Sequence, residues 1–414
     1  MNVLRWFPLL LAGCNVEAVR GDTGGVGPGE GGPCPDGITV VLSDFLSTQV
    51  ALSTTDGVTQ SESFVSTASV RSDGLSFALS GDVVLPTERP RSGRVVLLDR
   101  HGTNVVTFMD PVDGKVLGQL PVGTGFQSNP YDYLEIDEGR AYVARFGNNG
   151  ISGREPFDQG SDLLIIDTLA PEIVGRVALP SSDDFPAHPS GLIRLDDQHV
   201  VVTLQRHAQA LGSGAEDSML AGIDSKTDSI VWQLVLDGLK NCGTARLAPS
   251  GRELAVACSG LITRDGETLG LEESGIVVLD TQRSPPVEMR RFGAGDIAGE
   301  PLQSEVAFFA DGQVLLKTQT ARGAGSDNRL IWLDLESGQA RTVFTVDPSA
   351  RGVGIGVTLG AVACAPGCSD YCLVADAAAG ALQRLRVSDG RIEHIDSLAV
   401  ERRVGLPPVG LCYR

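Results

Sequence analysis

Residues 163–179 read LLIIDTLAPEIVGRVAL. An apolar run ends at Asp167, a polar turn follows, and a second run begins at once, which is the pattern of two short strands joined by a tight turn. The pattern returns around four other aspartates and, with a different residue at the aspartate position, twice more: Asp110, Asp224, Asp280, Asp334, Ser53 and Arg386. The chain is therefore built on an internal repeat.

The length of the repeat identifies its architecture. The seven positions are separated by 57, 57, 57, 56, 54 and 52 residues. Helical solenoid repeats are shorter and show a 3.6-residue period, whereas these runs alternate or are wholly apolar over about five or six residues, as strands do. A repeat of about fifty residues that holds four short strands is typical of a propeller blade. The sequence predicts an all-β fold, with a seven-bladed β-propeller at residues 38–414.

The two ends of the repeat predict how the ring closes. The first copy supplies three strands, at 39–43, 49–53 and 60–65, and the chain ends in a spare run, Pro408–Tyr413. Together they complete one blade, and this sharing leaves no open sheet edge. The alternative, an open sandwich with a loose C-terminal tail, leaves the sevenfold spacing unexplained. The second blade is expected to begin near Phe77.

The N-terminus has the anatomy of an export signal. Residues 1–5 carry one positive charge, 6–12 are apolar but too short to span a bilayer, and Leu11-Ala12-Gly13-Cys14 follows. This resembles the lipobox of bacterial lipoproteins, in which the cysteine is acylated after cleavage. We expect a signal peptide at 1–13, a lipidated Cys14, and a flexible Gly-rich tether at 14–37. The alternative is a buried N-terminal strand with an incidental cysteine.

The charge balance narrows the choice of partners. The chain has 33 basic and 52 acidic residues, a formal net charge of −19. Such a surface repels nucleic acid phosphates and anionic lipid head groups, so we expect no nucleic acid partner. Its larger effect is to keep the protein soluble.

Two stretches carry a resemblance to a known family: SGDVVLP at 80–86 and GTGFQSNPYDYLEI at 123–136. Through them the chain resembles the seven-bladed propellers of the YVTN or quinoprotein-like type, with WD40-like repeats. It is more closely similar to the lipid-anchored propellers of myxobacteria. The resemblance covers residues 38–414 and implies a fold and a cell-envelope location. It implies no reaction, because propellers host unrelated functions.

An envelope compartment permits disulfides among the eight cysteines. Cys242 and Cys258 each lie eight residues from Ser250 in an expected hairpin turn, so they are predicted to face each other across the strands. A Cys34–Cys412 bond is predicted to lock the ring closure, and Cys364–Cys372 is the third predicted pair. Cys368 is then free or intermolecular. Zinc or a cluster at Cys364, Cys368 and Cys372 is disfavoured because no His is near in sequence.

No motif for catalysis or cofactor binding is present. The five histidines form no H-x-x-x-H or H-E-x-x-H motif, so no three-ligand metal site is expected. Calcium loops, nucleophile elbows, phosphate loops, dinucleotide fingerprints and haem-attachment motifs are also missing from the sequence. We expect no cofactor.

Four long insertions mark a candidate binding face. They join the second and third strands of consecutive blades, at 147–161, 208–218, 259–274 and 321–327, and are expected on one face of the ring. The basic residues near them could bind an anionic or sugar ligand; the candidates are Arg145, Arg206, His207, Arg264 and Arg322. The preferred interpretation is plainer: these residues pair with local acids such as Asp158 and Asp217, because ion pairs in loops are ordinary.

These observations favour a non-enzymatic scaffold that binds a protein or glycan at the cell envelope. Asn15, rather than Asp, follows the cysteine, which by analogy with enteric bacteria favours the outer membrane. The alternative is a lactonase-like hydrolase that uses Arg145, Arg206 and His207. A quinone-dependent dehydrogenase is disfavoured because the chain has only three Trp, one of them in the signal.

Overall fold

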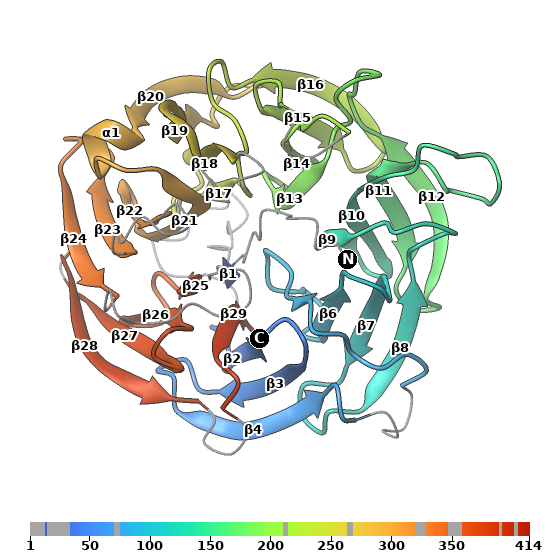
Figure 1. Ribbon diagram of the computed structural model, residues 1–414, viewed down its shortest axis with the longest axis horizontal. Helices are drawn as coiled ribbons and strands as arrows, with labels where there is room; N and C mark the ends of the chain where they lie inside the picture. Colours follow the sequence, from blue (N-terminus) through green and yellow to red (C-terminus); the bar gives the residue numbers. More distant parts are fainter. Residues whose placement is uncertain are drawn as a thin grey trace, which may run out of the picture.

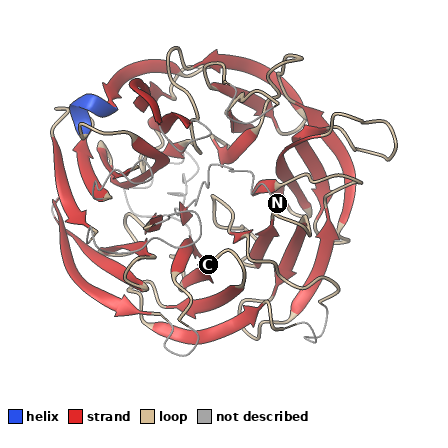
Figure 2. Ribbon diagram, viewed as in Figure 1, coloured by secondary structure: helices blue, strands red, loops and turns tan. Residues whose placement is uncertain are grey.

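The computed structural model describes residues 13–14, 34–69, 75–209, 214–262, 268–319, 328–346, 358–388, 391–400 and 405–414. Seven sheets of strands stand around a central axis as the blades of a ring (Figure 1). Figure 2 shows that the regular secondary structure of the described chain is strand, apart from one short helix, α1 (Ala294–Ile297). The predicted signal peptide up to Ala12, most of the tether, Arg264 and Arg322 lie outside the described residues.

Blades 2 to 7 each have four antiparallel strands in chain order from the axis outward. Blade 2 contains β5 (Val83–Val84), β6 (Val95–Asp99), β7 (Val105–Met109) and β8 (Val116–Pro121). Blade 3 contains β9 (Pro130–Asp137), β10 (Arg140–Asn148), β11 (Gly160–Asp167) and β12 (Glu172–Ala178). Blade 4 contains β13 (Pro189–Arg194), β14 (His199–Leu204), β15 (Met219–Asp224) and β16 (Ser229–Val235).

The remaining blades follow the same plan. Blade 5 contains β17 (Arg246–Leu247), β18 (Glu253–Ile262), β19 (Thr268–Asp280) and β20 (Val287–Gly293). Blade 6 contains β21 (Leu302–Ala310), β22 (Gln313–Thr318), β23 (Arg329–Asp334) and β24 (Ala340–Thr345). Blade 7 contains β25 (Leu359–Cys364), β26 (Tyr371–Asp376), β27 (Ala381–Ser388) and β28 (Arg391–Ala399).

Blade 1 closes the ring as predicted. Its inner strand is β29 (Pro408–Tyr413), followed by β2 (Ile38–Ser43), β3 (Thr48–Ser53) and β4 (Thr59–Ser66). β29 pairs antiparallel with β2, with Val40 opposite Leu411. A two-residue strand, β1 (Gly13–Cys14), pairs parallel with the other side of β29 and lies near the centre of Figure 1.

Three details of the sequence prediction were wrong. Blade 2 begins at Val83 rather than near Phe77. The expected insertion at 259–274 is a hairpin extension, because β18 and β19 continue to pair as far as Ile262 and Thr268. β27 runs two residues beyond Arg386, so Ser388 ends the third strand of blade 7.

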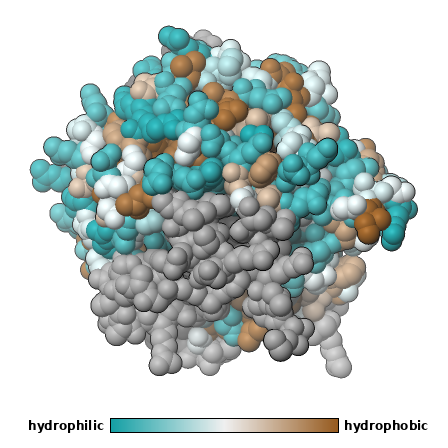
Figure 3. All heavy atoms as spheres, turned by 45° about the horizontal axis from the view of Figure 1, so that its top comes forward, coloured by the Kyte–Doolittle hydropathy of each residue, from teal (hydrophilic) through white to brown (hydrophobic). Residues whose placement is uncertain are grey.

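Burial explains the apolar runs of the repeat. Second and third strands such as β2 and β3 are buried along their whole length, because each blade is packed between two others. The fourth strands, such as β12, are partly exposed and read as mixed polar and apolar sequence. The described part of the face in Figure 3 is mainly hydrophilic, with apolar residues scattered among the polar ones. This agrees with the formal net charge of −19.

The repeated aspartate closes the turn between third and fourth strands. In blade 6, Oδ1 of Asp334 accepts the backbone N–H groups of Glu336 at 3.0 Å and Ser337 at 2.7 Å. The other four repeated aspartates accept backbone N–H groups in the same way: Asp110, Asp167, Asp224 and Asp280. A carboxylate is favoured here because it satisfies donors that the tight turn leaves without a ladder partner.

Buried carboxylates join neighbouring blades near the axis. In blades 2 to 7 the first strand is the inner edge of its sheet, so its N–H groups on that side have no ladder partner. Asp132 in β9 accepts the N–H of Leu192 in the next blade at 2.7 Å, and that of Thr87 in the previous blade at 2.8 Å. Glu305 in β21 accepts the N–H of Val362 in β25 at 3.2 Å. These bonds satisfy the inner edges and fix each blade against the next.

Disulfides add covalent ties, and one prediction needs correction. Cys242–Cys258 and Cys364–Cys372 are bonded as expected. Cys34 bonds to Cys368, not to Cys412, which ties the start of blade 1 to the turn between β25 and β26. Cys412 is also disulfide-bonded, so none of the seven described cysteines outside β1 carries a free thiol.

We predict that Asp334→Ala will lower the free energy of unfolding by about 1–2 kcal/mol at pH 7, because the turn loses its acceptor. The N–H of Ser337, first among the causes, holds the pKa of Asp334 below its usual value. The ionised group therefore stabilises the fold above the unfolded pKa, and this contribution is lost as pH falls through the lower folded pKa. Urea unfolding of the variant and wild type should differ less at pH 3 than at pH 7.

Glu336→Ala is the matched control, since Glu336 is exposed in the same turn and contributes its backbone N–H, rather than its carboxylate, to the bond with Asp334. A loss of stability as large in the control, or no loss in Asp334→Ala at pH 7, would contradict the capping role.

Candidate functional site

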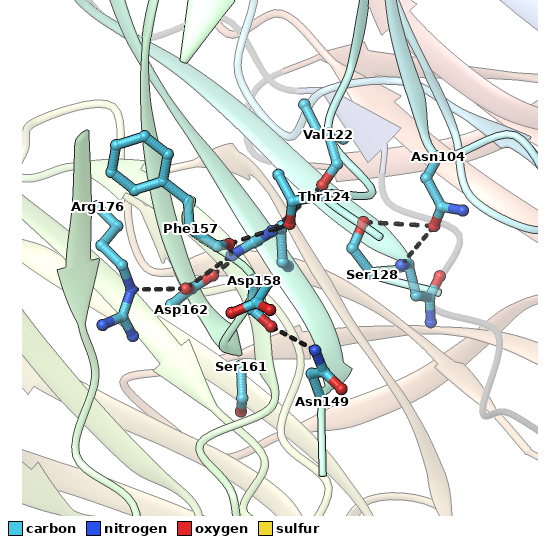
Figure 4. A network of polar contacts seen from close by, with 12 residues as sticks. Asn104, Val122, Thr124, Ser128, Asn149, Phe157, Asp158, Ser161, Asp162 and Arg176 are labelled. Carbon is cyan, nitrogen blue, oxygen red and sulfur yellow. Dashed lines mark hydrogen bonds and ion pairs between the residues drawn. The ribbon is translucent and has the colours of Figure 1, made fainter. Parts of the chain in front are cut away.

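Arg145, the first candidate from the sequence, is a buried structural residue. It lies near the end of β10, and its side chain has no exposed area. Nε and Nη2 donate to the two carboxylate oxygens of Asp162 in β11, each at 2.8 Å. Asp162 also accepts Nε of Arg176 at 2.9 Å, so one carboxylate joins two guanidinium groups (Figure 4).

The remaining donors of Arg145 are also used. Nη1 donates to Oγ1 of Thr124 at 2.7 Å and to the carbonyl of Val122 at 3.3 Å, and Nη2 donates to the carbonyl of Phe157 at 2.6 Å. A guanidinium has five N–H groups, and all five of these have acceptors. Arg145 therefore holds the base of the insertion loop and has no donor left for a ligand.

The insertion loop of blade 3 is closed by Asp158. The buried carboxylate of Asp158 accepts N–H groups from Gly153, Arg154 and Glu155 at 2.8–3.1 Å. These bonds, that of Gly153 first, hold the pKa of Asp158 below its usual value. Asn149 closes the base of the loop by donating Nδ2 to the carbonyl of Asp158 at 2.7 Å (Figure 4). The loop is thus ordered by its own polar groups.

The ordered loop presents its tip to solvent. Ile151 is 65% exposed, and the residues that follow it to Pro156 are exposed as well. The loop projects from the rim of the ring between β10 and β11 (Figure 1). It is a preformed protrusion on the face predicted to carry the binding residues.

The second pair of candidates, Arg206 and His207, follows β14. Arg206 makes an ion pair with Glu216 and donates Nη1 to the carbonyl of Asp217 at 3.2 Å. His207 is buried, and its Nε2 lies 3.0 Å from Oδ1 of Asn241. Arg145 and Arg206 are therefore engaged with local acids, as the preferred interpretation of the sequence predicted. Arg264 and Arg322 lie outside the described residues.

His207 belongs to a group of rings that the sequence analysis did not identify. Tyr131 stacks on Phe146 with centroids 4.8 Å apart, and Phe146 stacks on His188 at 4.5 Å. His188 and His207 are 6.3 Å apart and tilted by 55°. Tyr131, Phe146, His188 and His207 are all buried, and we call them the aromatic belt. Beyond Tyr131, Arg100 lies over its ring at 5.1 Å.

The aromatic belt runs across two blades on the face of the insertion loops. Tyr131 and His188 stand at the start of the first strands β9 and β13, and Phe146 and His207 near the ends of the second strands β10 and β14. The spacing from Tyr131 to His188 is 57 residues, equal to the repeat interval. This was the signal that could have revealed the belt: repeat-equivalent positions of neighbouring blades lie side by side.

Buried charges near the axis were also missed, because they occupy strands expected to be apolar. Arg246 in β17 is buried near the carboxylates of Glu305, Asp132 and Glu88, and desolvation lowers its pKa despite their attraction. Lys317 makes an ion pair with Glu305 and donates to the carbonyl of Gly360. These contacts join one blade to another, so the cluster stabilises the ring.

Two of the candidate cations on this face, Arg145 and Arg206, are taken up by local acceptors. The belt histidines are neutral because burial lowers the pKa of His188 to about 4 and that of His207 in the same direction. Within the described ranges, no three His, Cys, Asp or Glu side chains are grouped to hold a metal.

We predict that Arg145→Met will lower the free energy of unfolding by about 3–5 kcal/mol, because it removes a buried partner of Asp162 and leaves carbonyls of the loop unsatisfied. Arg154→Met, in the exposed part of the same loop, should change it by less than about 0.5 kcal/mol. Equilibrium unfolding in guanidinium measures both. Equal, small effects of the two substitutions would show that Arg145 does not hold the loop.

Comparison with known proteins identifies the fold. No known family model and no curated protein matches this sequence. Among solved structures, the chain is similar to the periplasmic gluconolactonase PpgL of Pseudomonas aeruginosa (15% identity, TM-score 0.56, 91% of this chain and 98% of that one). It is also similar to hydrazine synthase of Kuenenia stuttgartiensis (13%, 0.55, 88% and 99%) and to a protein from Lactobacillus plantarum (10%, 0.58, 92% and 99%). At these identities the likeness shows the β-propeller fold alone.

Proposed function

We propose that the protein is a lipid-anchored cell-envelope protein, with the outer membrane as its location, whose propeller binds a protein or glycan partner. The observation that carries the binding role is the ordered, exposed loop of blade 3. Ile151 stands 65% exposed on a loop that Asp158 has already fixed, so little conformational entropy is lost when a partner docks there. An exposed apolar residue in a rigid polar setting is a typical anchor for an interface.

Two features support the envelope location. The Leu11–Cys14 sequence resembles a lipobox, and three disulfides join six other cysteines of the described chain. Disulfides persist in oxidising compartments and are rare in the cytosol. A lipid anchor followed by a tether would leave the ring free to meet a partner.

The second candidate function, a lactonase-like hydrolase, gains no specific observation. The solved structures that share the fold include gluconolactonases. Arg145 and Arg206 would have to stabilise a developing oxyanion, but Arg145 has all five donors engaged and Arg206 is held by Glu216. The binding role is therefore preferred.

We predict that Ile151→Asp will abolish partner capture without changing the fold. Proximity labelling in intact cells with the lipidated protein should enrich a specific partner with wild type, and about tenfold less with Ile151→Asp, as expected for loss of a hot-spot residue. Leu169→Asp is the matched control, because Leu169 is 66% exposed in the turn between β11 and β12, at the opposite end of these strands.

Three outcomes would count against this role: equal labelling by both variants, recovery of bulk envelope proteins alone, or turnover of a lactone panel by purified protein. The last would restore the hydrolase hypothesis.

The anchor has its own test. Cys14→Ser should move the protein from the membrane fraction to the soluble fraction, because several acyl chains are lost with the thiol. The mass of the N-terminal peptide reports the modification directly. The backbone of Cys14 pairs with that of Cys412 in β1 and β29. Cys412 is disulfide-bonded, and the six other described cysteines outside β1 pair among themselves. A Cys14–Cys412 disulfide in place of acylation is therefore the outcome that would contradict the lipid anchor.

A further inference from the structure

Two buried ring nitrogens in the aromatic belt have no hydrogen-bond partner among the described residues. They are Nε2 of His188 and Nδ1 of His207. The two side chains belong to residues only 5% and 4% exposed, so bulk water does not compensate them. A buried polar atom without a partner costs free energy, and such an atom calls for an occupant.

The neighbours of each ring fix which nitrogen carries the proton. Nδ1 of His188 lies 2.6 Å from the carbonyl of Phe146, which can only accept, so Nδ1 is the donor. Nε2 of His188 is then a lone pair.

The same logic applies to His207. Asn241 donates Nδ2 to Oγ of Ser259 at 2.6 Å, which turns its Oδ1 toward Nε2 of His207 at 3.0 Å. Nε2 must therefore carry the proton, and Nδ1 is a lone pair. Both partnerless nitrogens are acceptors, so the missing occupant is a donor of hydrogen bonds or a cation.

The other nitrogen of each ring makes the hydrogen bond that is usual for a metal-binding histidine. A ligating imidazole usually donates its other N–H to a backbone carbonyl or side-chain oxygen, which fixes the ring and raises its basicity. Phe146 and Asn241 supply these acceptors. Burial lowers the pKa of both rings, which keeps them neutral, and the neutral imidazole is the form that binds metals.

The distance between the rings selects the coordination geometry. An ion about 2.0–2.1 Å from a ring nitrogen lies roughly 3.2 Å from the ring centroid, so two rings on one ion stand at most about 6.4 Å apart, and roughly 5.2 Å apart at a tetrahedral angle. The centroids of His188 and His207 are 6.3 Å apart. At this separation the two nitrogens can share one ion only as a nearly linear pair, and not at a tetrahedral angle.

The residues around His188 and His207 favour an ion of low charge. The rings contact Phe146, and within the described chain their polar contacts are the carbonyl of Phe146 and the side-chain amides of Gln205 and Asn241, not a carboxylate. A divalent ion here would be a buried, uncompensated double charge, which costs far more than a single one. A third protein ligand is also not grouped with them in the described chain.

We propose that His188 and His207 form a two-coordinate site for a soft monovalent cation such as Cu⁺. Imidazole nitrogen is an accepted ligand of copper, and a linear pair of nitrogens is sufficient for a d¹⁰ monovalent ion. The site is independent of the proposed partner binding, since the belt is buried and the loop tip is exposed.

Silver ion is the probe, because Ag⁺ has the same charge and coordination preference and needs no reductant. Calorimetric titration of the purified, oxidised protein should show one equivalent of Ag⁺ bound. A Met289→Leu background removes the exposed thioether, and the described cysteines outside β1 are in disulfides, so the competing soft ligands are few. Binding should also raise the melting temperature, because the ion binds only the folded state.

The variants separate ligation from packing. His188→Leu and His207→Leu should each weaken Ag⁺ binding at least about a hundredfold, whereas His188→Met, of similar size and with a soft thioether, should retain binding. His199→Gln is the control, since His199 is paired with Asp196 outside the belt. Thermal unfolding without silver shows that each variant is folded.

Two results would overturn the proposal. If wild type binds no Ag⁺, the two lone pairs are bridged by a buried water only. If His188→Leu and His207→Leu bind as tightly as wild type, the silver is adventitious and lies elsewhere.

Discussion

The ring depends on how the inner edges of its sheets are satisfied. The first strands of blades 2 to 7 turn N–H groups without a ladder partner toward the neighbouring blades, and leaving these groups without an acceptor would cost about 1–3 kcal/mol each. Carboxylates on the adjoining blades accept them, as Asp132 does for Leu192 and Thr87, and Glu305 for Val362. Burial in turn raises the pKa of Asp132 to about 6, so these acids need cations nearby. Arg246 and Lys317 are buried in the same region for this reason.

Each blade of this fold is marked by interactions between residues close together in sequence, which is why the architecture could be predicted from the sequence. Asp167 and its counterparts end third strands because a carboxylate closes the tight turn, and this local need marks each blade. The start of blade 2 was misjudged because β5 has only two residues. Side chains hold the segment before it: Asp99 accepts the N–H of Ser80 at 2.6 Å, and Gln119 that of Phe77 at 2.8 Å.

The candidate site was less predictable because its contacts are long-range. The sequence singled out Arg145 and Arg206 as basic residues in an acidic chain. Only the fold shows that Arg145 forms an ion pair with Asp162 and Arg206 with Glu216. His188 was overlooked because its importance comes from a neighbour in another blade, Phe146. The partner of Cys34 was wrong for a similar reason: Cys368 lies 334 residues away, and its turn reaches blade 1 only once the ring has formed.

Sharing one blade between the two ends of the chain has a consequence for biogenesis. β2 is among the first strands to be synthesised, yet its pairing strand β29 is the last, at Pro408–Tyr413. An open, apolar edge therefore persists on the nascent polypeptide until Pro408–Tyr413 has been synthesised. The blade that begins first is completed last, so a chain that stops before Pro408 would form a ring that cannot close.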